Sequence, residues 1–433
     1  MLYKIYAMKL VIIGGGFGGL RLARELSNKS GFDITLLDRF NYHQFQPLFY
    51  QVATAGLDAS NISFPLRKVF HHSKNVRFCM ATVNEIVHAQ NKVVTDIGNF
   101  EYDQLVIATG ADTNFFGNAL MQANAMPMKS TVEAIELRHR ILKNFEDAAA
   151  CKDAVELQRL MHIVVVGGGP TGVELSGAIA DMRRFVLPKD YPELDFASMK
   201  ITLLEGTAKT LGTMSEKSSQ QSKAYLEKLG VVVQTNAILK NYDGNTATLL
   251  DGSTIETALV IWAAGIKGNI IPGFDNAIIA RGNRIKVNNQ CLVNGFINVY
   301  AIGDVAYMDA DVAYSNGHPQ VAPVAIQQAD MLVNNLMMLN MKSNTDRMQS
   351  FVYNDKGAMA TVGRKLAVVD MPKPKLHFGG FLAWLVWMFL HLMLILGVKN
   401  RLSVFFNWFY NYFTKDQNLR LIFKVNYRER GKG

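Results

Sequence analysis

The sequence predicts an α/β fold in which one βαβ unit occurs twice, and three observations support this prediction. A glycine-rich turn, Gly14–Gly19, follows a short apolar stretch near the start of the chain. A second such turn, Gly167–Gly172, follows another apolar stretch about 150 residues later. After each turn an acidic residue ends a further apolar strand, Asp38 in the first unit and Glu205 in the second. Strands that alternate with helices in this way form parallel sheets.

Both turns have glycines where a dinucleotide-binding turn requires them. The first glycine permits a tight turn, the second lets the backbone approach a pyrophosphate, and the third allows the helix to pack closely on the strand. These positions are Gly14, Gly16 and Gly19 in the first turn and Gly167, Gly169 and Gly172 in the second. The pyrophosphate would bind the free N–H groups at the start of the helix. The sequence therefore predicts two Rossmann-like dinucleotide-binding domains, as in a flavin–nicotinamide oxidoreductase; an ordinary βα connection is the alternative for each turn.

The two acidic residues differ in their distance from the turns. Asp38 lies 19 residues after Gly19, where a carboxylate is expected to reach a ribose hydroxyl. Glu205 lies 33 residues after Gly172, and we interpret residues 183–198 as an insertion that causes this delay. Because a carboxylate pairs with a free 2′-hydroxyl but repels a 2′-phosphate, Glu205 predicts a preference for NADH over NADPH.

Three further strand ends indicate where the chain returns to the two nucleotides. One apolar stretch ends in Ala108-Thr109-Gly110, and its counterpart in the second unit ends in Ala263-Ala264-Gly265. A third stretch, from Asn298, runs into Gly303-Asp304, where Asp304 is suited to bind the ribityl chain or to order water at the flavin diphosphate.

The order of these motifs predicts that the NADH domain is inserted into the flavin domain. A helix over residues 130–150, with Ser130 as N-cap and Glu133 as its capping-box partner, leads into the second unit. The predicted domains are residues 1–125 (first part of the FAD-binding domain), 126–285 (NADH-binding domain), 286–370 (second part of the FAD-binding domain) and 371–433 (membrane-anchoring region).

The C-terminal region differs from the rest of the chain in charge. Residues 371–433 contain 10 Lys and Arg but only two Asp and Glu, so they carry +8 of the net charge of +9. Residues 376–398 contain none of these four residue types. We predict an amphipathic helical anchor that lies in the membrane interface and binds anionic lipid, preceded by a linker at 371–375.

Two alternatives for this region remain open. The uncharged run is long enough to span a bilayer, but a single span would place the basic end opposite a body that must meet cytosolic NADH, against the positive-inside tendency. The region could instead be a buried core helix or a dimer contact. Nucleic-acid binding is disfavoured because aromatic residues dominate positions 404–413.

The cysteines exclude several functions. Cys79, Cys151 and Cys291 have no CxxC pattern and no metal-ligand spacing, so we expect no metal site and no disulfide framework. We interpret all three as small buried side chains. A dithiol reductase of this plan would need a Cys-x4-Cys after the first acidic strand, and residues 41–52 contain no cysteine. The first strand begins close to residue 1, so we also expect no signal peptide.

With these motifs located, the chain resembles the type II NADH dehydrogenases, which are single-subunit, non-pumping NADH:quinone oxidoreductases. The resemblance covers nearly the whole chain. Its more specific parts are residues 38–53 (DRFNYHQFQPLFYQVA), 167–175, 299–306 and 319–328 (PQVAPVAIQQ), together with the tail.

The resemblance implies non-covalent FAD, NADH as substrate and a quinone as acceptor. The residues expected at FAD are Gly14, Gly16, Phe17, Gly18, Gly19, Asp38, Arg39, Pro47, Val83, Ala108, Thr109, Gly110, Asp304 and Ala322. Those expected at NADH are Gly167, Gly169, Thr171, Gly172, Val173, Glu174, Glu205, Ala264 and Gly265. Those expected at the quinone are Ala322, Pro323, Ile326, Gln327 and Gln328.

Two residues are predicted to be catalytic. Gln327 could hold a quinone carbonyl, since an amide both donates and accepts; the family usually has a glutamine where this chain has Pro323, so a mechanism that needs both amides is in doubt. Glu174 follows the second turn, on what we expect to be the first turn of its helix, where the dipole favours a carboxylate. The resemblance implies that Glu174 positions NADH or relays protons.

The predicted reaction is hydride transfer from NADH to flavin N5, followed by transfer of two electrons to a membrane quinone without proton pumping. The resemblance further implies a homodimer bound peripherally at the cytoplasmic face of a bacterial inner membrane. A sulfide:quinone oxidoreductase is an alternative, although Cys151 and Cys291 do not fit the cysteines that it needs at the flavin. A non-catalytic NADH-sensing membrane adaptor on the same fold is the other alternative.

Overall fold

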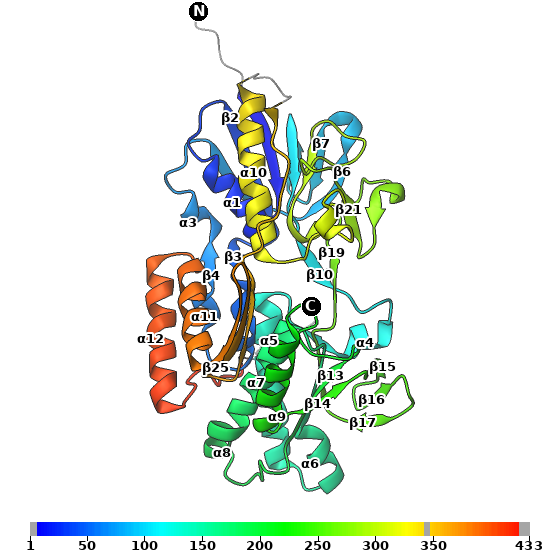
Figure 1. Ribbon diagram of the computed structural model, residues 1–433, viewed down its shortest axis with the longest axis vertical. Helices are drawn as coiled ribbons and strands as arrows, with labels where there is room; N and C mark the ends of the chain where they lie inside the picture. Colours follow the sequence, from blue (N-terminus) through cyan, green and yellow to red (C-terminus); the bar gives the residue numbers. More distant parts are fainter. Residues whose placement is uncertain (1–6, 342–346, 424–433) are drawn as a thin grey trace, which may run out of the picture. The chain divides into compact units, whose positions relative to one another are not determined.

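The computed structural model describes residues 7–341 and 347–423 and divides into two compact units (Figure 1). The first unit consists of the described residues up to Gln44, of Ser63–Asp112 and of the described residues from Ile266 to Asp355. The second consists of Phe45–Ile62, Thr113–Gly265 and the described residues from Lys356 onward. The predicted bounds of the cofactor-binding domains stay a prediction.

A five-stranded parallel sheet forms the centre of the first unit. Its strand order is β22 (Val299–Ala301), β9 (Gln104–Ile107), β1 (Met8–Ile13), β2 (Phe32–Asp38) and β5 (Val76–Met80). Leu10, Ile12, Ile34 and Leu36 are fully buried, as expected for parallel strands that are covered on both faces. Helix α1 (Phe17–Glu25) and helix α10 (Ala322–Asn340) pack against each other (Figure 1). The side chain of Arg21 binds Asp330 at 2.6 Å.

Shorter elements complete the first unit. They are β3 (Tyr42–Gln44), β4 (Ser63–Pro65), α3 (Leu66–Val69), β6 (Val83–Val87), β7 (Lys92–Thr95), β8 (Gly98–Glu101), β19 (Ile266–Gly268), β20 (Ile279–Ala280), β21 (Arg284–Lys286) and β23 (Ala306–Tyr307). Strand β10 (Ala111–Thr113) ends at the boundary between the units.

The second unit repeats the parallel sheet. Its strand order is β11 (Met126–Pro127), β18 (Leu259–Trp262), β12 (His162–Val166), β13 (Lys200–Glu205) and β14 (Val232–Thr235). The predicted duplication of the βαβ unit is therefore confirmed. A small antiparallel sheet of β15 (Leu239–Tyr242), β16 (Thr246–Leu249) and β17 (Thr254–Glu256) adds Tyr242 and Leu249 to the apolar core.

Several helices of the second unit precede its C-terminal region. They are α2 (Phe49–Ala53), α4 (Ala119–Asn124), α5 (Thr131–Ala150), α6 (Ala154–Leu160), α7 (Pro170–Phe185), α8 (Leu187–Asp190) and α9 (Glu216–Lys228). Helix α5 begins with the predicted capping box of Ser130 and Glu133. Residues 183–198, predicted as an insertion, contain the last turn of α7 and all of α8 before β13 begins.

The C-terminal region does not begin with a linker. Strands β24 (Ala358–Val362), β25 (Leu366–Pro372) and β26 (Lys375–Gly380) form an antiparallel sheet, and Pro372 pairs with Lys375 across a tight hairpin. The expected linker at 371–375 is therefore wrong: these residues form the hairpin itself. Proline is tolerated here because it stands at strand ends, where it interrupts few ladder bonds.

The long uncharged run is divided among three elements. Its first residues belong to β26, the next form α11 (Phe381–Leu394), and Val398 begins α12 (Val398–Thr414). With 14 residues, α11 is about 21 Å long, which is shorter than the hydrocarbon core of a bilayer, about 30 Å. Within residues 7–341 and 347–423, none of the helices has the length and apolar character needed to cross a membrane.

Candidate functional site

The first glycine turn leads from β1 into α1 and has no room for side chains at two positions. Gly14 has φ +107°, and a Cβ atom on it would lie 2.3 Å from the carbonyl oxygen of Ala108. A Cβ atom on Gly19 would lie 2.0 Å from the carbonyl oxygen of Gly14. Gly16 is different, because no atom lies within 4 Å of the place of its Cβ. Gly16 is also the N-cap of α1, so the free space lies beside the start of the helix.

Asp38 is held directly against this turn. Its Oδ2 accepts the backbone N–H of Gly15 at 2.6 Å, and its Oδ1 accepts that of Phe40 at 2.8 Å. Burial raises the pKa of the Asp38 carboxyl above its ordinary value, and the two backbone N–H groups partly oppose this effect. The carboxylate is therefore fixed beside the glycine turn, as a group that binds a ribose would need to be.

The other residues predicted at FAD come from neighbouring strand ends or from more distant positions. Because β22, β9 and β1 are parallel neighbours, Asp304, Ala108 and Gly14 follow strands that end at one edge of the sheet. Thr109 already donates its hydroxyl to the carbonyl oxygen of Asn269 at 2.6 Å. Among the remaining predictions, Arg39 follows β2, Val83 begins β6, and Gly110 comes shortly after β9. Phe17 and Gly18 begin α1, and Ala322 begins α10. Pro47 lies in the second unit.

Helix α10 carries the residues predicted at the quinone. The buried side chain of Gln328 accepts the backbone N–H of Gly303 at 2.7 Å, so this glutamine fastens the helix to the end of β22. Gln327 uses both ends of its amide on the backbone of Asn354: it donates to the carbonyl oxygen at 3.0 Å and accepts the N–H at 2.9 Å. Pro323 lies in the first turn, where a missing N–H costs nothing, and Ile326 follows one turn later.

The second glycine turn has the same geometry as the first. Gly167 has φ +107°, and a Cβ atom on it would lie 2.5 Å from the carbonyl oxygen of Ala263. A Cβ atom on Gly172 would lie 1.9 Å from the carbonyl oxygen of Gly167. Gly169 is the N-cap of α7 and, like Gly16, has open space at its Cβ position.

Backbone N–H groups fix the carboxylate of Glu205, as they do that of Asp38. Its Oε2 accepts the backbone N–H of Gly168 at 2.6 Å, and its Oε1 accepts the backbone N–H of Thr207 at 2.7 Å. Of the other residues predicted at NADH, Ala264 and Gly265 follow β18, which pairs with β12 beside the turn; Thr171 is exposed at the start of α7, and Val173 is fully buried.

The position of Glu174 corrects the prediction. Helix α7 begins at Pro170, so Glu174 is its fifth residue and lies beyond the first turn, which contains no acidic residue. Its side chain is 8% exposed and accepts the backbone N–H of Thr361 at 3.3 Å. Burial raises the pKa of Glu174 to about 8. At neutral pH the carboxyl is therefore mostly protonated, and it is not the dipole-stabilised carboxylate that we expected.

A hydrogen-bonded chain of side chains that the sequence did not predict leads away from Glu174. The hydroxyl of Thr361 lies 3.0 Å from that of Tyr50, which accepts the side-chain amide of Gln51 at 2.9 Å. The amide oxygen of Gln51 accepts the indole N–H of Trp408 at 2.6 Å. Helix α12 is thereby connected to α2 and to the end of β24. Tyr50 and Gln51 lie within the motif 38–53, which is the one sequence signal that could have identified them.

The cysteines differ from the expectation in part. Cys291 is buried, which raises the pKa of its thiol, but Cys79 and Cys151 are partly exposed. All three are free. Across the part of the chain that the structure describes, no group of three or more His, Cys, Asp or Glu side chains could hold a metal ion.

The two glycine turns fit dinucleotides on the geometry alone. Each has one glycine with open space, at the N-cap of a helix whose first N–H groups carry the positive end of the helix dipole. Each also has a carboxylate fixed by a backbone N–H of the turn, that of Gly15 in the first turn and that of Gly168 in the second. Together, these features suit a diphosphate with a ribose next to it.

Comparison with known proteins gives a consistent result. Residues 8–329 match the family described as Pyridine nucleotide-disulphide oxidoreductase, and residues 356–415 match the NDH2 C-terminal domain. The type II NADH:quinone oxidoreductase Ndh of Mycobacterium tuberculosis is 35% identical over 412 residues, covering 92% of this chain and 87% of that protein. The type II NADH:quinone oxidoreductase NdhA of the same organism is 36% identical over 415 residues, covering 92% and 86%.

Solved structures share the fold. NDH2 from Plasmodium falciparum in complex with NADH has a TM-score of 0.85 at 21% identity, covering 96% of this chain and 100% of that chain. The sulfide:quinone oxidoreductase of Aquifex aeolicus has a TM-score of 0.70 at 19% identity, covering 92% of each. From the family matches and the mycobacterial relatives, the chain belongs to the pyridine nucleotide-disulphide oxidoreductases and, within them, to the type II NADH:quinone oxidoreductases.

Proposed function

We propose that this protein binds FAD non-covalently at the first glycine turn, oxidises NADH bound at the second, and reduces a membrane quinone. The observation that carries this proposal is the duplicated arrangement in which Gly15 and Gly168 each donate a backbone N–H to a carboxylate at 2.6 Å. The family of the chain supports the same reaction. Bound FAD would supply the redox chemistry, namely a hydride acceptor at N5 and two electrons for the quinone.

The chain's own residues hold the two nucleotides. The open backbone at Gly16 and Gly169 lets the two diphosphates approach the starts of α1 and α7. Asp38 and Glu205 accept hydrogen bonds from ribose hydroxyls. Because a 2′-phosphate would lie against the carboxylate of Glu205, NADH is the preferred donor.

Glu174 and Gln327 have separate roles in quinone reduction in this proposal. Glu174 is protonated near neutral pH, so it can donate a proton when a quinone is reduced and recover it from solvent. Gln327 holds a quinone carbonyl only after its amide leaves the backbone of Asn354, with which it forms two hydrogen bonds. The quinone therefore competes with a local contact. Ala322, Pro323, Ile326 and Gln328 complete the predicted surroundings.

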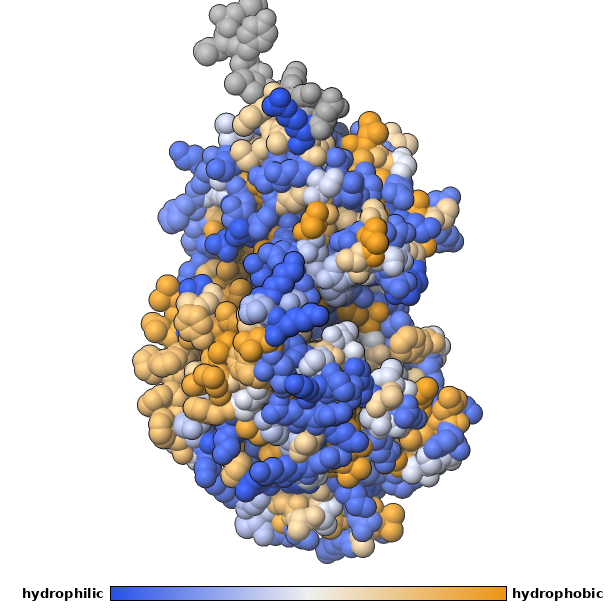
Figure 2. Space-filling model, viewed as in Figure 1, coloured by the Kyte–Doolittle hydropathy of each residue, from blue (hydrophilic) through white to orange (hydrophobic). Residues whose placement is uncertain are grey.

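The last two helices attach the protein to the membrane. Figure 2 shows hydrophobic side chains gathered over α11 and α12. Those exposed there are Phe381, Leu382, Leu385, Phe389, Leu390, Met393, Leu394, Val398, Leu402, Phe405, Phe406, Phe409, Tyr410 and Phe413. A continuous apolar face of this size marks an interaction surface. We infer peripheral binding to anionic lipid at the cytoplasmic face of a bacterial inner membrane, as a homodimer and without proton pumping.

One experiment tests the function. Purified protein should be yellow, NADH should bleach its visible flavin absorbance, and a soluble quinone should restore it under anaerobic conditions. Bleaching without reoxidation by any quinone would exclude the quinone oxidoreductase and favour an NADH-sensing adaptor. Bleaching by sulfide instead of NADH would favour a sulfide:quinone oxidoreductase.

A further inference from the structure

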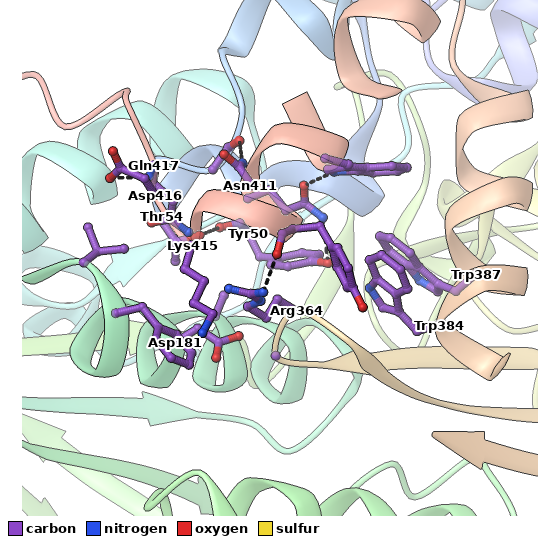
Figure 3. A pocket seen from close by; sticks show the side chains of 18 residues that line it. Tyr50, Thr54, Asp181, Arg364, Trp384, Trp387, Asn411, Lys415, Asp416 and Gln417 are labelled. Atoms are coloured by element: carbon purple, nitrogen blue, oxygen red, sulfur yellow. Dashed lines mark hydrogen bonds between the residues drawn. The ribbon is translucent and has the colours of Figure 1, made fainter. Parts of the chain in front are cut away.

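The second unit contains a cavity of about 100 Å³ between α2, α7, α11, α12 and the turn that joins β24 to β25 (Figure 3). Aromatic side chains form much of its wall, among them Trp384, Trp387 and Tyr412. Lys415, at the end of α12, also lines the cavity and is exposed to solvent. The cavity therefore extends from the surface at Lys415 toward the interior of the unit.

Four polar atoms of the cavity's lining residues lack a partner among the described residues. Two are donors, the Nη1 of Arg364 and the indole Nε1 of Trp387, and two are acceptors, the Oδ2 of Asp181 and the Oε1 of Gln417. Asp181 is 7% exposed and Trp387 is 2% exposed. Buried polar groups without protein partners are normally satisfied by ordered water. A cavity of this size has room for several water molecules. Because it reaches the surface at Lys415 and polar side chains line it, we infer that the cavity is hydrated.

Asp181 and Glu174 lie on the same face of α7. They are seven residues apart, which is two helical turns and a rise of about 10 Å. Ala178, which lies between them on this face, also lines the cavity and is too small to block it. Asp181 belongs to the cavity wall, whereas Glu174 is buried and is not among the residues that line the cavity.

A hydrogen-bonded route connects the cavity with Glu174. Tyr50 lines the cavity, and its hydroxyl lies 3.0 Å from the hydroxyl of Thr361. The hydroxyl of Thr361 in turn hydrogen-bonds the carboxyl of Glu174, which also accepts the backbone N–H of Thr361 at 3.3 Å. Hydroxyl groups can both donate and accept a proton, so the route from cavity water to Glu174 runs through groups that can pass one on.

We propose that this cavity carries protons from solvent to Glu174, and that Asp181 is the residue that takes up each proton from the water inside it. This inference rests on the proposed function, in which Glu174 donates a proton during quinone reduction. The overall reaction needs such a supply. NADH delivers two electrons and one proton as hydride, while a quinone needs two electrons and two protons to become a quinol. One proton per turnover must therefore come from solvent.

The charges around Asp181 suit this role. Burial raises the pKa of Asp181 to about 6, while the backbone N–H of Arg364 and the charges of Arg364, Arg184 and Lys365 oppose the rise. Across the cavity, α12 and the residues after it present Lys415 and Asp416, and α2 presents the neutral hydroxyl of Tyr50. Asp181 can thus gain and lose a proton near neutral pH. Glu174, with a pKa of about 8, accepts that proton favourably.

The test compares D181N with E193Q, which removes an exposed carboxylate of the same unit, in full-length FAD-loaded protein. Asn keeps the shape of Asp181 but cannot carry a proton. We expect D181N to lower kcat with a soluble quinone about tenfold. The rate of flavin bleaching by NADH should stay within about twofold of the parent. The rate of ferricyanide reduction should do the same, because ferricyanide takes up no proton. The pH above which kcat declines should differ between D181N and the parent. D181E should restore kcat, and E193Q should behave as the parent.

Other outcomes overturn the proposal. If D181N leaves kcat and its pH profile unchanged, Asp181 carries no proton. If D181N only raises KM for the quinone, the cavity holds the quinone ring instead of water. If the parent protein itself fails to reduce quinone, the proposed function fails, and this result is recognised before any variant is compared.

A second variant keeps the test valid if D181N does not fold. A178L fills the cavity while both carboxyls remain. We expect it to lower quinone-dependent kcat and to increase the solvent deuterium isotope effect on kcat by about twofold, because proton delivery becomes slower. Unchanged kcat and an unchanged isotope effect in A178L would contradict a hydrated route.

Discussion

Gly168 donates its backbone N–H to the carboxylate of Glu205 at 2.6 Å, so the glycine turn itself fixes the acidic residue that is expected to recognise the ribose. The same distance separates Gly15 from Asp38. The backbone N–H groups of Gly15 and Gly168 therefore orient side chains that lie 23 and 37 residues further along the chain.

The charge of Glu205 should determine which nicotinamide nucleotide is used. In E205Q the side chain still accepts the N–H of Gly168 but no longer repels a phosphate. We expect the ratio of kcat/KM for NADH to that for NADPH to fall about tenfold, which corresponds to about 1.4 kcal/mol. Steady-state kinetics with both nucleotides measures this ratio. An unchanged ratio would remove Glu205 from the nucleotide site.

Gly14 and Gly16 should respond differently to alanine. In G16A the added methyl group meets no protein atom, because nothing lies within 4 Å, so the protein should fold normally and lose FAD affinity. In G14A the methyl group would lie 2.3 Å from the carbonyl oxygen of Ala108, and φ +107° is strained for alanine. We expect G14A to lose thermal stability as well.

Two measurements distinguish these variants: flavin content from the visible spectrum, and the unfolding temperature of the protein stripped of flavin. Normal flavin content in G16A would show that the diphosphate does not approach this turn.

The pKa of Glu174 predicts how stability depends on pH. Between about pH 5 and pH 8 the folded protein keeps a proton on Glu174 that the unfolded chain releases, so stability should fall as pH rises through this range. Asp181 should add to the fall between about pH 4 and pH 6. E174Q cannot lose a proton, so its unfolding temperature should decline less between pH 5 and pH 8, by about 2 °C or more. Parallel curves for parent and variant would contradict the raised pKa.

The hydroxyl of Tyr50 should stabilise the second unit. Y50F removes the contact with Thr361 and the acceptor for Gln51 while the ring stays buried. We expect a loss of about 1–2 kcal/mol in the free energy of unfolding. Urea denaturation followed by near-ultraviolet circular dichroism reports it. Y102F is a matched control, because the buried hydroxyl of Tyr102 lacks a hydrogen-bond partner in the described structure.

The apolar face of α11 and α12 should carry the affinity for membranes. Phe389 and Phe406 are 60% and 62% exposed. Replacing both with Asp should reduce co-sedimentation with vesicles that contain anionic lipid at least tenfold, because two large apolar contacts are lost and two negative charges are added. NADH-dependent reduction of ferricyanide should persist. V155D, at a 73% exposed position of α6, is the control; equal binding of both variants would place the membrane contact elsewhere.

The sequence was most informative where structure depends on local patterns. The glycine turns and the capping box of Ser130 each depend on residues close in the chain, and the carboxylates Asp38 and Glu205 end the next apolar strand of the same βαβ unit; the structure contains all of them. The hairpin at Pro372 was missed because prolines and lysines in succession are typical of linkers, and only the pairing with neighbouring strands shows otherwise.

The surroundings of Glu174 could not be read from local patterns. Its burial depends on Thr361, which is 187 residues later, and on Tyr50, far earlier in the chain. The pairing of Gln327 with Asn354 has the same character, because no motif marks Asn354. Side chains that meet only after the chain has folded have no recognisable spacing pattern in the sequence.

The indole of Trp408 hydrogen-bonds Gln51, while Phe406 and Phe409 of the same helix are exposed. A movement of α12 at a lipid surface would therefore shift α2 through the hydrogen bond between Trp408 and Gln51, which is the residue next to Tyr50. We expect turnover measured in detergent to differ from turnover on vesicles even when the quinone is water-soluble, because the environment of this helix would itself act as an effector.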